Sequence, residues 1–219
     1  MQRVFLETKY EGKLEVPKEI IRKLPPQLVL AMPVQFLDFQ EQIKKQLEKA
    51  GKKVVLFQSR HGKYPGQILG CDVFKFKGDY DAFFYIGDGK FHPTALLYEN
   101  KKPVYCYHPF NQKLEVLEQK NLEFVLKRRQ GQLAKFLNSK SVGILVTTKP
   151  GQNQSKKAEE LREKLEKAGK EAFVFLADEI NFSSLENFNF IDGWINTACP
   201  RIVEDFRGLN LVDLKEVGF

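Results

Sequence analysis

The hexapeptide Leu47-Glu48-Lys49-Ala50-Gly51-Lys52 occurs a second time, residue for residue, as Leu165-Glu166-Lys167-Ala168-Gly169-Lys170. In each copy, apolar residues at helical spacing are followed by a glycine, which is typical of the end of a helix. An apolar segment typical of a strand follows each copy. The repeat therefore predicts an internal duplication of a unit in which a helix leads into a strand.

The segments around the two hexapeptides also follow one another in the same order. We expect strand 28–33, helix 39–50 and strand 53–58 in the first half, and strand 142–147, helix 155–168 and strand 172–176 in the second. In each half a third strand follows and begins with an aspartate, Asp81 or Asp192. This order predicts an α/β fold of two tandem related domains, each a small parallel sheet flanked by helices.

The boundary between the domains is expected between residues 112 and 139. We assign residues 1–112 to a first α/β domain and 113–219 to a second. The second is expected to begin with a helix over about 114–137, which follows a strand at 104–107 and carries the basic run Lys127-Arg128-Arg129.

Composition limits the class of protein. With 219 residues and 42% hydrophobic content, the chain is long enough for packed cores, but its longest apolar runs have only the length of strands. We therefore expect no membrane segment. The first residues lack the apolar stretch of a secretory signal, so a cytoplasmic location is expected. The net charge of +7 comes without a basic run interleaved with aromatics, and no direct nucleic-acid contact is predicted.

Two of the three cysteines lie in segments typical of sites. Cys71 stands between Gly70 and Asp72, and Cys199 precedes Pro200, so we expect both thiols on accessible loops. Cys106 lies within an apolar strand and is expected in the core. In a reducing compartment, cysteines serve metal binding, catalysis or packing more often than disulfides.

Unusual segments also follow the predicted strands. Residues 87–93 follow strand 82–86, residues 147–152 follow strand 142–146, and Cys199 follows the last strand of the second unit. Ligands of parallel α/β sheets bind beyond the carboxyl ends of the strands. We therefore expect these loops to converge on a cleft between the domains.

Four motifs in this order resemble the diphthamide synthase family of archaea and eukaryotes. They are Gly66-Gln67-x-Leu69-Gly70-Cys71, Gly87-x-Gly89-x-Phe91-His92-Pro93, Thr148-Lys149-x-Gly151-Gln152 and Ala198-Cys199-Pro200-Arg201. The resemblance covers roughly residues 16–207 and corresponds to the second and third of the family's three domains. It implies a shortened member, in which residues 4–8 resemble a remnant of the last strand of the first domain.

The resemblance also implies an activity. The family uses an unusual radical mechanism in which S-adenosyl-L-methionine is cleaved at a [4Fe-4S] cluster held by three cysteines, one from each domain. A 3-amino-3-carboxypropyl group is then transferred to a histidine of translation elongation factor 2. The resemblance therefore implies a transferase of diphthamide biosynthesis. It implies Cys71 and Cys199 as metal ligands, with no other catalytic residue.

The resemblance leaves the third cluster ligand open. A separate first-domain protein, the other subunit of a homo-oligomer, or Cys106 could supply it. The residues expected at the cofactor, S-adenosyl-L-methionine, are Gln67, Gly87, Gly89, His92, Thr148, Lys149, Gly151 and Gln152.

Other interpretations and secondary expectations remain. The chain could be a non-catalytic scaffold or electron-transfer subunit of the same complex, or an aminocarboxypropyl transferase with another acceptor. His61 and His108 are expected at the surface or in turns, and Trp194 in the core. The 188–190 region and the basic helix are candidate docking surfaces for the acceptor.

Overall fold

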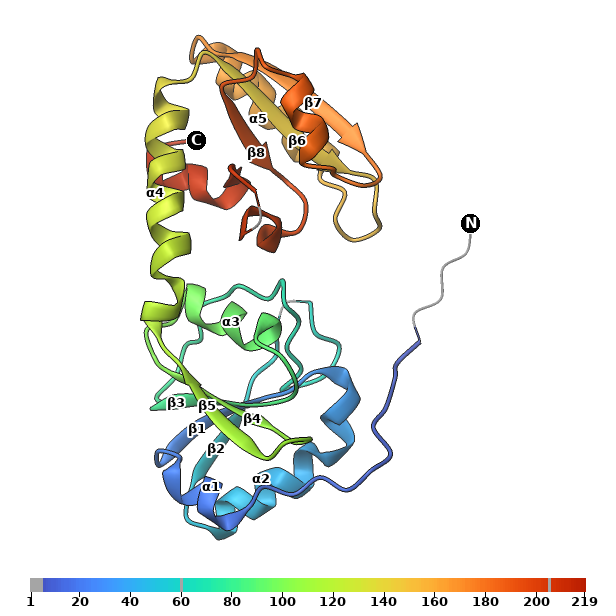
Figure 1. Cartoon of the computed structure of the whole chain (residues 1–219), viewed down its shortest axis with the longest axis vertical. Coiled ribbons are helices and arrows are strands. Elements are labelled where there is room, and N and C mark those ends of the chain that lie inside the picture. The colour runs from blue at the N-terminus through green and yellow to red at the C-terminus, as the bar shows by residue number, and fades with distance from the viewer. Residues whose placement is uncertain (1–5, 60, 205) are drawn as a thin grey trace. The chain divides into compact units, whose positions relative to one another are not determined.

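The computed structural model describes residues 6–59, 61–204 and 206–219. The chain divides into two compact units, Met1–Leu122 and Glu123–Phe219, and each contains one sheet (Figure 1). Within the described part of the chain, no helix is both long and apolar enough to cross a membrane.

The first unit is built on a sheet of five strands in the order β2-β1-β3-β4-β5. The pairs within β2-β1-β3-β4 are parallel, and β5 runs antiparallel to β4. Its elements are α1 (Lys18–Lys23), β1 (Gln27–Ala31), η1 (Val34–Phe39), α2 (Gln40–Lys49), β2 (Lys53–Leu56), β3 (Ala82–Ile86), α3 (Phe91–Tyr98), β4 (Val104–His108), β5 (Lys113–Leu117) and η2 (Gln119–Leu122).

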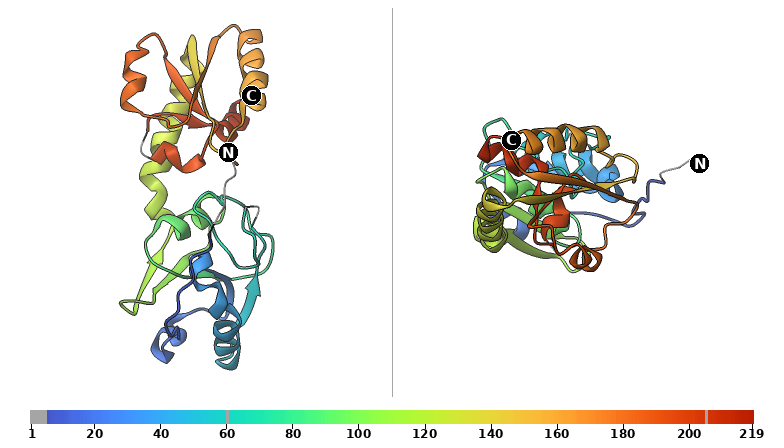
Figure 2. Two further views of the ribbon diagram at one scale, coloured as in Figure 1. Left: turned by 90° about the vertical axis from the view of Figure 1, so that its right-hand side faces the viewer. Right: turned by 90° about the horizontal axis from the view of Figure 1, so that it is seen from above.

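The second unit has a parallel sheet of four strands in the order β7-β6-β8-β9. Helix α5 packs against β6 and β7 of this sheet (Figure 2). The elements of the second unit are α4 (Glu123–Asn138), β6 (Ser141–Thr147), α5 (Ser155–Lys167), β7 (Glu171–Ala177), η3 (Ser183–Asn187), β8 (Gly193–Asn196), η4 (Pro200–Glu204), β9 (Leu209–Asn210) and η5 (Leu211–Val217).

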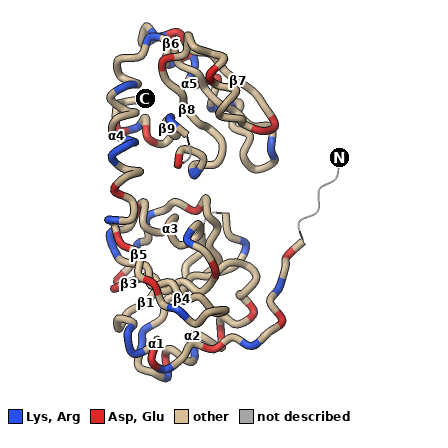
Figure 3. The backbone as a smooth tube through the Cα atoms, in the orientation of Figure 1, with Lys and Arg blue, Asp and Glu red and all other residues tan. Residues whose placement is uncertain are grey.

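The two sheets confirm the predicted duplication. The order β2-β1-β3-β4 in the first unit corresponds to β7-β6-β8-β9 in the second, with α2 and α5 as equivalent crossover helices. Both helices bury an apolar stripe, Ile43 and Leu47 in α2 and Leu161 and Leu165 in α5. Lysines and arginines are interspersed with acidic residues along both helices (Figure 3).

The repeated hexapeptide ends both helices in the same way. Gly51 and Gly169 adopt the left-handed conformation, with φ of 80° and 81°. The N–H of Lys52 then donates to the carbonyl of Leu47 at 3.1 Å, and that of Lys170 to Leu165 at 3.0 Å. These bonds satisfy carbonyls that a helix end would otherwise leave without partners and turn the chain into the next strand.

The aspartates before the third strands also have equivalent roles. The carboxylate of Asp81 accepts a hydrogen bond from the N–H of Gln27 at 2.9 Å, at the start of β1. That of Asp192 accepts from Lys140 at 2.9 Å and Ser141 at 3.0 Å, at the start of β6. Each aspartate thus joins the beginnings of two neighbouring strands.

The linking segment differs from the prediction. Residues 113–117 form strand β5, and the helix begins only at Glu123. Because β5 pairs with β4 along its length, residues 113–122 group with the first unit, whose end at Leu122 lies within the region of 112–139 expected for the boundary. Of the expected remnant strand, residues 4 and 5 lie outside the described residues and residues 6–8 form no strand.

Candidate functional site

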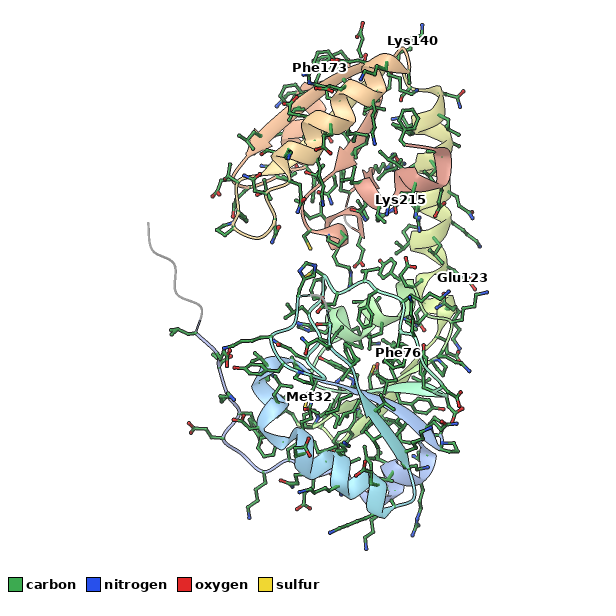
Figure 4. The ribbon with its side chains drawn as sticks, turned by 180° about the vertical axis from the view of Figure 1, so that it is seen from behind. Met32, Phe76, Glu123, Lys140, Phe173 and Lys215 are labelled. Carbon is green, nitrogen blue, oxygen red and sulfur yellow. The ribbon has the colours of Figure 1, made fainter. Side chains whose placement is uncertain are left out.

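The segment that carries Cys71 lies at the carboxyl end of β1. The N–H of Met32 donates to the carbonyl of Gly66 at 2.9 Å, and that of Ile68 donates to Met32 at 3.0 Å. Residues 66–68 thereby extend the parallel pairing beyond Ala31. Figure 4 labels Met32, the residue with which they pair, within the first unit. The sheet itself places the predicted motif at the edge where α/β proteins bind ligands.

Gln67 has a structural role within this segment. Its side chain is buried, and its amide oxygen accepts hydrogen bonds from the N–H groups of Lys63 at 2.6 Å and Tyr64 at 3.1 Å. The amide oxygen therefore closes the turn that precedes the cysteine.

Cys71 is partly exposed, and the carboxylate of Asp72 organises the loop around it. One Asp72 oxygen accepts from the N–H of Leu69 at 2.9 Å, and the other accepts from the N–H of His61 at 3.1 Å. The Asp72 side chain is only 2% exposed. It joins the turn that leads into Cys71 to the preceding strand-to-loop segment.

The glycine segment, residues 87–93, follows β3, the strand next to β1. The N–H of Gly87 donates to the carbonyl of Tyr107 at 3.1 Å, and Gly89 has a φ of 69°. The expected loop ends sooner than residue 93, because Phe91, His92 and Pro93 form the first turn of α3. Proline fits a first helical turn, where its missing N–H would have no partner in the helix.

The β4–β5 hairpin supports this segment. Lys90 forms an ion pair with Glu115 at 2.9 Å, and its hydrogen bond holds the pKa of the Glu115 carboxyl below its ordinary value. His108 was expected at the surface or in a turn, which is wrong: it ends strand β4, is 8% exposed, and has Asp88 at 3.7 Å and Glu115 at 4.0 Å. Its burial follows from β5, which covers this edge of the sheet.

In the second unit, two loops lie at one sheet edge because β6 and β8 are parallel neighbours. The Thr197 hydroxyl and N–H both bond the carbonyl of Leu145, at 2.8 and 3.0 Å, where β6 and β8 end. The expected binding residues Thr148 and Lys149 contact Asp178 at 2.8 Å and Glu179 at 3.2 Å. These are exposed surface pairs that a ligand could exchange at low cost.

The 150–152 turn completes this first loop. Gly151 has a φ of 76°, and the N–H of Gln152 donates to the carbonyl of Lys149 at 3.1 Å. Gln152 is partly exposed. A left-handed glycine at this place turns the chain from the end of β6 toward α5.

Asn196 holds the loop that carries Cys199. Its amide nitrogen donates to the carbonyl of Cys199 at 2.9 Å and to the side-chain oxygen of Asn210 at 2.8 Å. Its amide oxygen accepts from the N–H of Ala198 at 2.9 Å. Asn210 in turn donates to the carbonyl of Pro200 at 2.9 Å. The Cys199 thiol is partly exposed on this braced turn.

Cys106 differs from the other two cysteines. It lies in β4 with 1% exposure, as predicted for a core residue, and burial raises the pKa of its thiol to about 12. At neutral pH it is therefore a protonated, inaccessible thiol.

The sequence interpretation missed Asp72, Asn196 and Asn210, whose side chains shape the cysteine loops. Asp72 directly follows Cys71, and Asn196 lies three residues before Cys199. A polar residue this close to a cysteine on a loop was the available signal. The distant Asn210 gave none.

The two partly exposed thiols are suited to a soft metal group. Iron–sulfur clusters are held by cysteine thiolates, and each of these two lies on a hydrogen-bonded loop at the carboxyl ends of the parallel strands of its own sheet. Within the described residues, no group of three or more His, Cys, Asp or Glu side chains could hold a metal ion. Each thiol is thus a donor of the kind that such a cluster requires.

Comparison with known proteins agrees with these motifs. The sequence model of the family described as "Putative diphthamide synthesis protein" matches residues 4–207. The chain belongs to this family.

Two relatives named as 2-(3-amino-3-carboxypropyl)histidine synthases show the extent of the similarity. The Pyrococcus horikoshii protein is 29% identical over 86% of this chain and 54% of its own length. Subunit 1 from Schizosaccharomyces pombe is 34% identical over 82% of this chain and 42% of its own length. The chain therefore spans about half the length of these relatives.

The fold is also that of a solved family member. The crystal structure of Dph2 from Pyrococcus horikoshii with a 4Fe-4S cluster superposes with a TM-score of 0.75 and 27% identity. The match covers 90% of this chain and 58% of that one. The α/β architecture predicted from the repeat is confirmed by this similarity.

Proposed function

We propose that this chain is a component of a diphthamide synthase, which transfers the 3-amino-3-carboxypropyl group of S-adenosyl-L-methionine to a histidine of translation elongation factor 2. The observation that carries the proposal is the pair of partly exposed thiols, Cys71 and Cys199, at equivalent edges of two duplicated sheets. Supporting it, a solved relative of the same fold contains a 4Fe-4S cluster.

In this proposal Cys71 and Cys199 are two ligands of a [4Fe-4S] cluster. When bound, the cluster supplies the electron that breaks the C–S bond of the sulfonium on the aminocarboxypropyl side, which releases methylthioadenosine. Three protein thiolates would leave one iron open to the amino and carboxylate groups of the substrate. We place the third thiolate outside these 219 residues, because Cys106 is buried and protonated.

A separate polypeptide or a second subunit is the proposed source of that thiolate. The relatives that are named subunit 1 support a complex of this kind. The three free cysteines agree with a reducing compartment, and we propose the cytoplasm.

The remaining residues of the two edges would bind and orient the substrate. Lys149 and Gln152 can meet its carboxylate once Lys149 leaves Glu179. Gly89 allows close approach of the backbone, and His92 lies in the first turn of α3, three residues later. Gly87, Thr148 and Gly151 complete the two loops, while Gln67 shapes the Cys71 segment through its hydrogen bonds.

Anaerobic reconstitution with iron and sulfide tests the proposal, performed with the chain alone and with a candidate partner. Iron content, the cluster spectrum and release of methylthioadenosine after dithionite reduction are measured. We expect loss of the cluster in Cys71→Ala and Cys199→Ala and no loss in Cys106→Ala. Loss in all three variants would instead make Cys106 the third ligand.

Two outcomes favour the other functions. A chain that binds no iron even with a partner would be a scaffold subunit. Release of methylthioadenosine without modification of elongation factor 2 would indicate a transferase with another acceptor.

A further inference from the structure

We propose that Asp72, Asn196 and Asn210 are positioning residues that fix the backbone of the two cysteine loops so that the thiols of Cys71 and Cys199 are held ready to ligate. The inference rests on the proposed cluster site and adds residues that do not themselves contact it.

The first brace is the carboxylate of Asp72. Its two oxygens accept backbone N–H groups from Leu69, in the turn that leads to Cys71, and from His61, in the segment that follows β2. With 2% exposure, the side chain has little solvent with which to exchange these bonds. The backbone N–H of Asp72 also donates to the carbonyl of Leu69 at 3.0 Å, which closes the turn.

The second brace is a pair of amides. Asn196, at 1% exposure, uses both its oxygen and its nitrogen on the turn 198–199, and its nitrogen also meets Asn210. Asn210 passes this connection on to the carbonyl of Pro200. The residues on both sides of the Cys199 thiol are therefore fixed to β8 and β9.

A carboxylate in the first unit and two amides in the second thus both fix the backbone beside a cysteine. A thiolate ligand gains affinity when its loop is already ordered, because binding then does not have to supply the entropy of ordering. Hydrogen-bonded residues behind metal ligands typically change metal affinity by about 10–100-fold when they are mutated. The two sets of braces act on separate loops, so their effects should be separable.

The test uses exchanges that preserve side-chain volume. Asp72→Asn replaces one acceptor oxygen by an NH2 group that faces a backbone N–H. Asn196→Asp removes both donated bonds and places a carboxylate against the Cys199 carbonyl. Asn210→Asp removes the donated bond to Pro200 and places a carboxylate oxygen against that carbonyl, and it serves if Asn196→Asp does not fold. The exposed residues Asp79 and Asn181 provide matched controls, Asp79→Asn and Asn181→Asp.

Two readouts are measured on the full chain. The first is the rate of cluster loss to a chelator, which should rise about tenfold in each brace variant. The second is the iodoacetamide alkylation rate of each thiol before reconstitution, resolved by mass spectrometry. We expect Asp72→Asn to change the rate of Cys71 only, and the asparagine variants to change that of Cys199 only, with control variants like wild type.

The outcomes separate the inference from the proposed function. Alkylation rates unchanged in every brace variant, or changed equally at both cysteines, would overturn the inference. Locally changed alkylation in a protein that never binds iron would uphold the braces and refute the cluster proposal. A cluster that is lost from brace variants no faster than from their controls would also overturn the inference.

Discussion

The ring of Phe91 lies directly over the backbone of Gly70. A Cβ atom placed on Gly70 would come within 1.8 Å of the nearest ring carbon. Since Gly70 precedes Cys71 and Phe91 begins α3, this contact packs the cysteine segment against the glycine segment within the first unit. The conformation of the cysteine segment therefore depends on the position of the Phe91 ring, although the two lie about 20 residues apart in sequence.

Gly70→Ala should consequently destabilise the first unit. We expect a loss of about 1–3 kcal/mol in the free energy of unfolding, because the ring must move or strain the turn. Urea denaturation measures the change. The double variant Gly70→Ala/Phe91→Ala should lose less stability than the sum of the single variants. Strict additivity would show that the two residues do not compete for this space.

The duplicated helix ends predict equal costs at two distant sites. Gly51→Ala and Gly169→Ala each force an L-residue into a left-handed conformation, although no neighbouring atom lies within 4 Å of the new Cβ. Each should lower the free energy of unfolding of its unit by about 1 kcal/mol. Asparagine, which tolerates this conformation better, should cost less at both positions. A loss at one site alone would contradict the equivalence of the two caps.

Asp192 predicts an acid-sensitive contribution to the second unit. Hydrogen bonds from Ser141 and then Lys140 lower the pKa of this carboxyl below its ordinary value. A lowered folded-state pKa means that the stabilisation is complete above the unfolded pKa of about 4 and is lost as the pH falls through the folded value. Thermal denaturation between pH 6 and pH 2 tests this.

The wild type should lose more stability below about pH 4 than Asp192→Asn, which cannot titrate. The thermal denaturation midpoints of the wild type and of Asp192→Asn should therefore approach one another in acid. Parallel curves over the whole range would refute the contribution of Asp192.

The three thiols should react at different rates. Because the pKa of Cys106 is raised to about 12 and the residue is buried, its alkylation at pH 8 should be at least about 100-fold slower than that of Cys71 or Cys199. Peptide mass spectrometry after timed iodoacetamide treatment measures all three rates. In urea the difference should disappear. Comparable rates in the native protein would show that β4 opens readily.

The sequence by itself determined the duplication and the main parallel strands. The hexapeptide ends, the aspartates before β3 and β8, and the apolar stripes of α2 and α5 are local patterns, and local backbone chemistry fixes helix ends and strand faces. It also separated Cys106, within an apolar run, from Cys71 and Cys199.

Only the tertiary structure decided the remainder. Residues 113–117 carry no strong local preference and become β5 because β4 offers an unpaired edge, and this pairing buries His108. Likewise, Asn210 supports the Cys199 loop although it lies eleven residues later, because β9 runs beside β8. Long-range pairing of strands creates such contacts between segments, and a local sequence pattern cannot specify them.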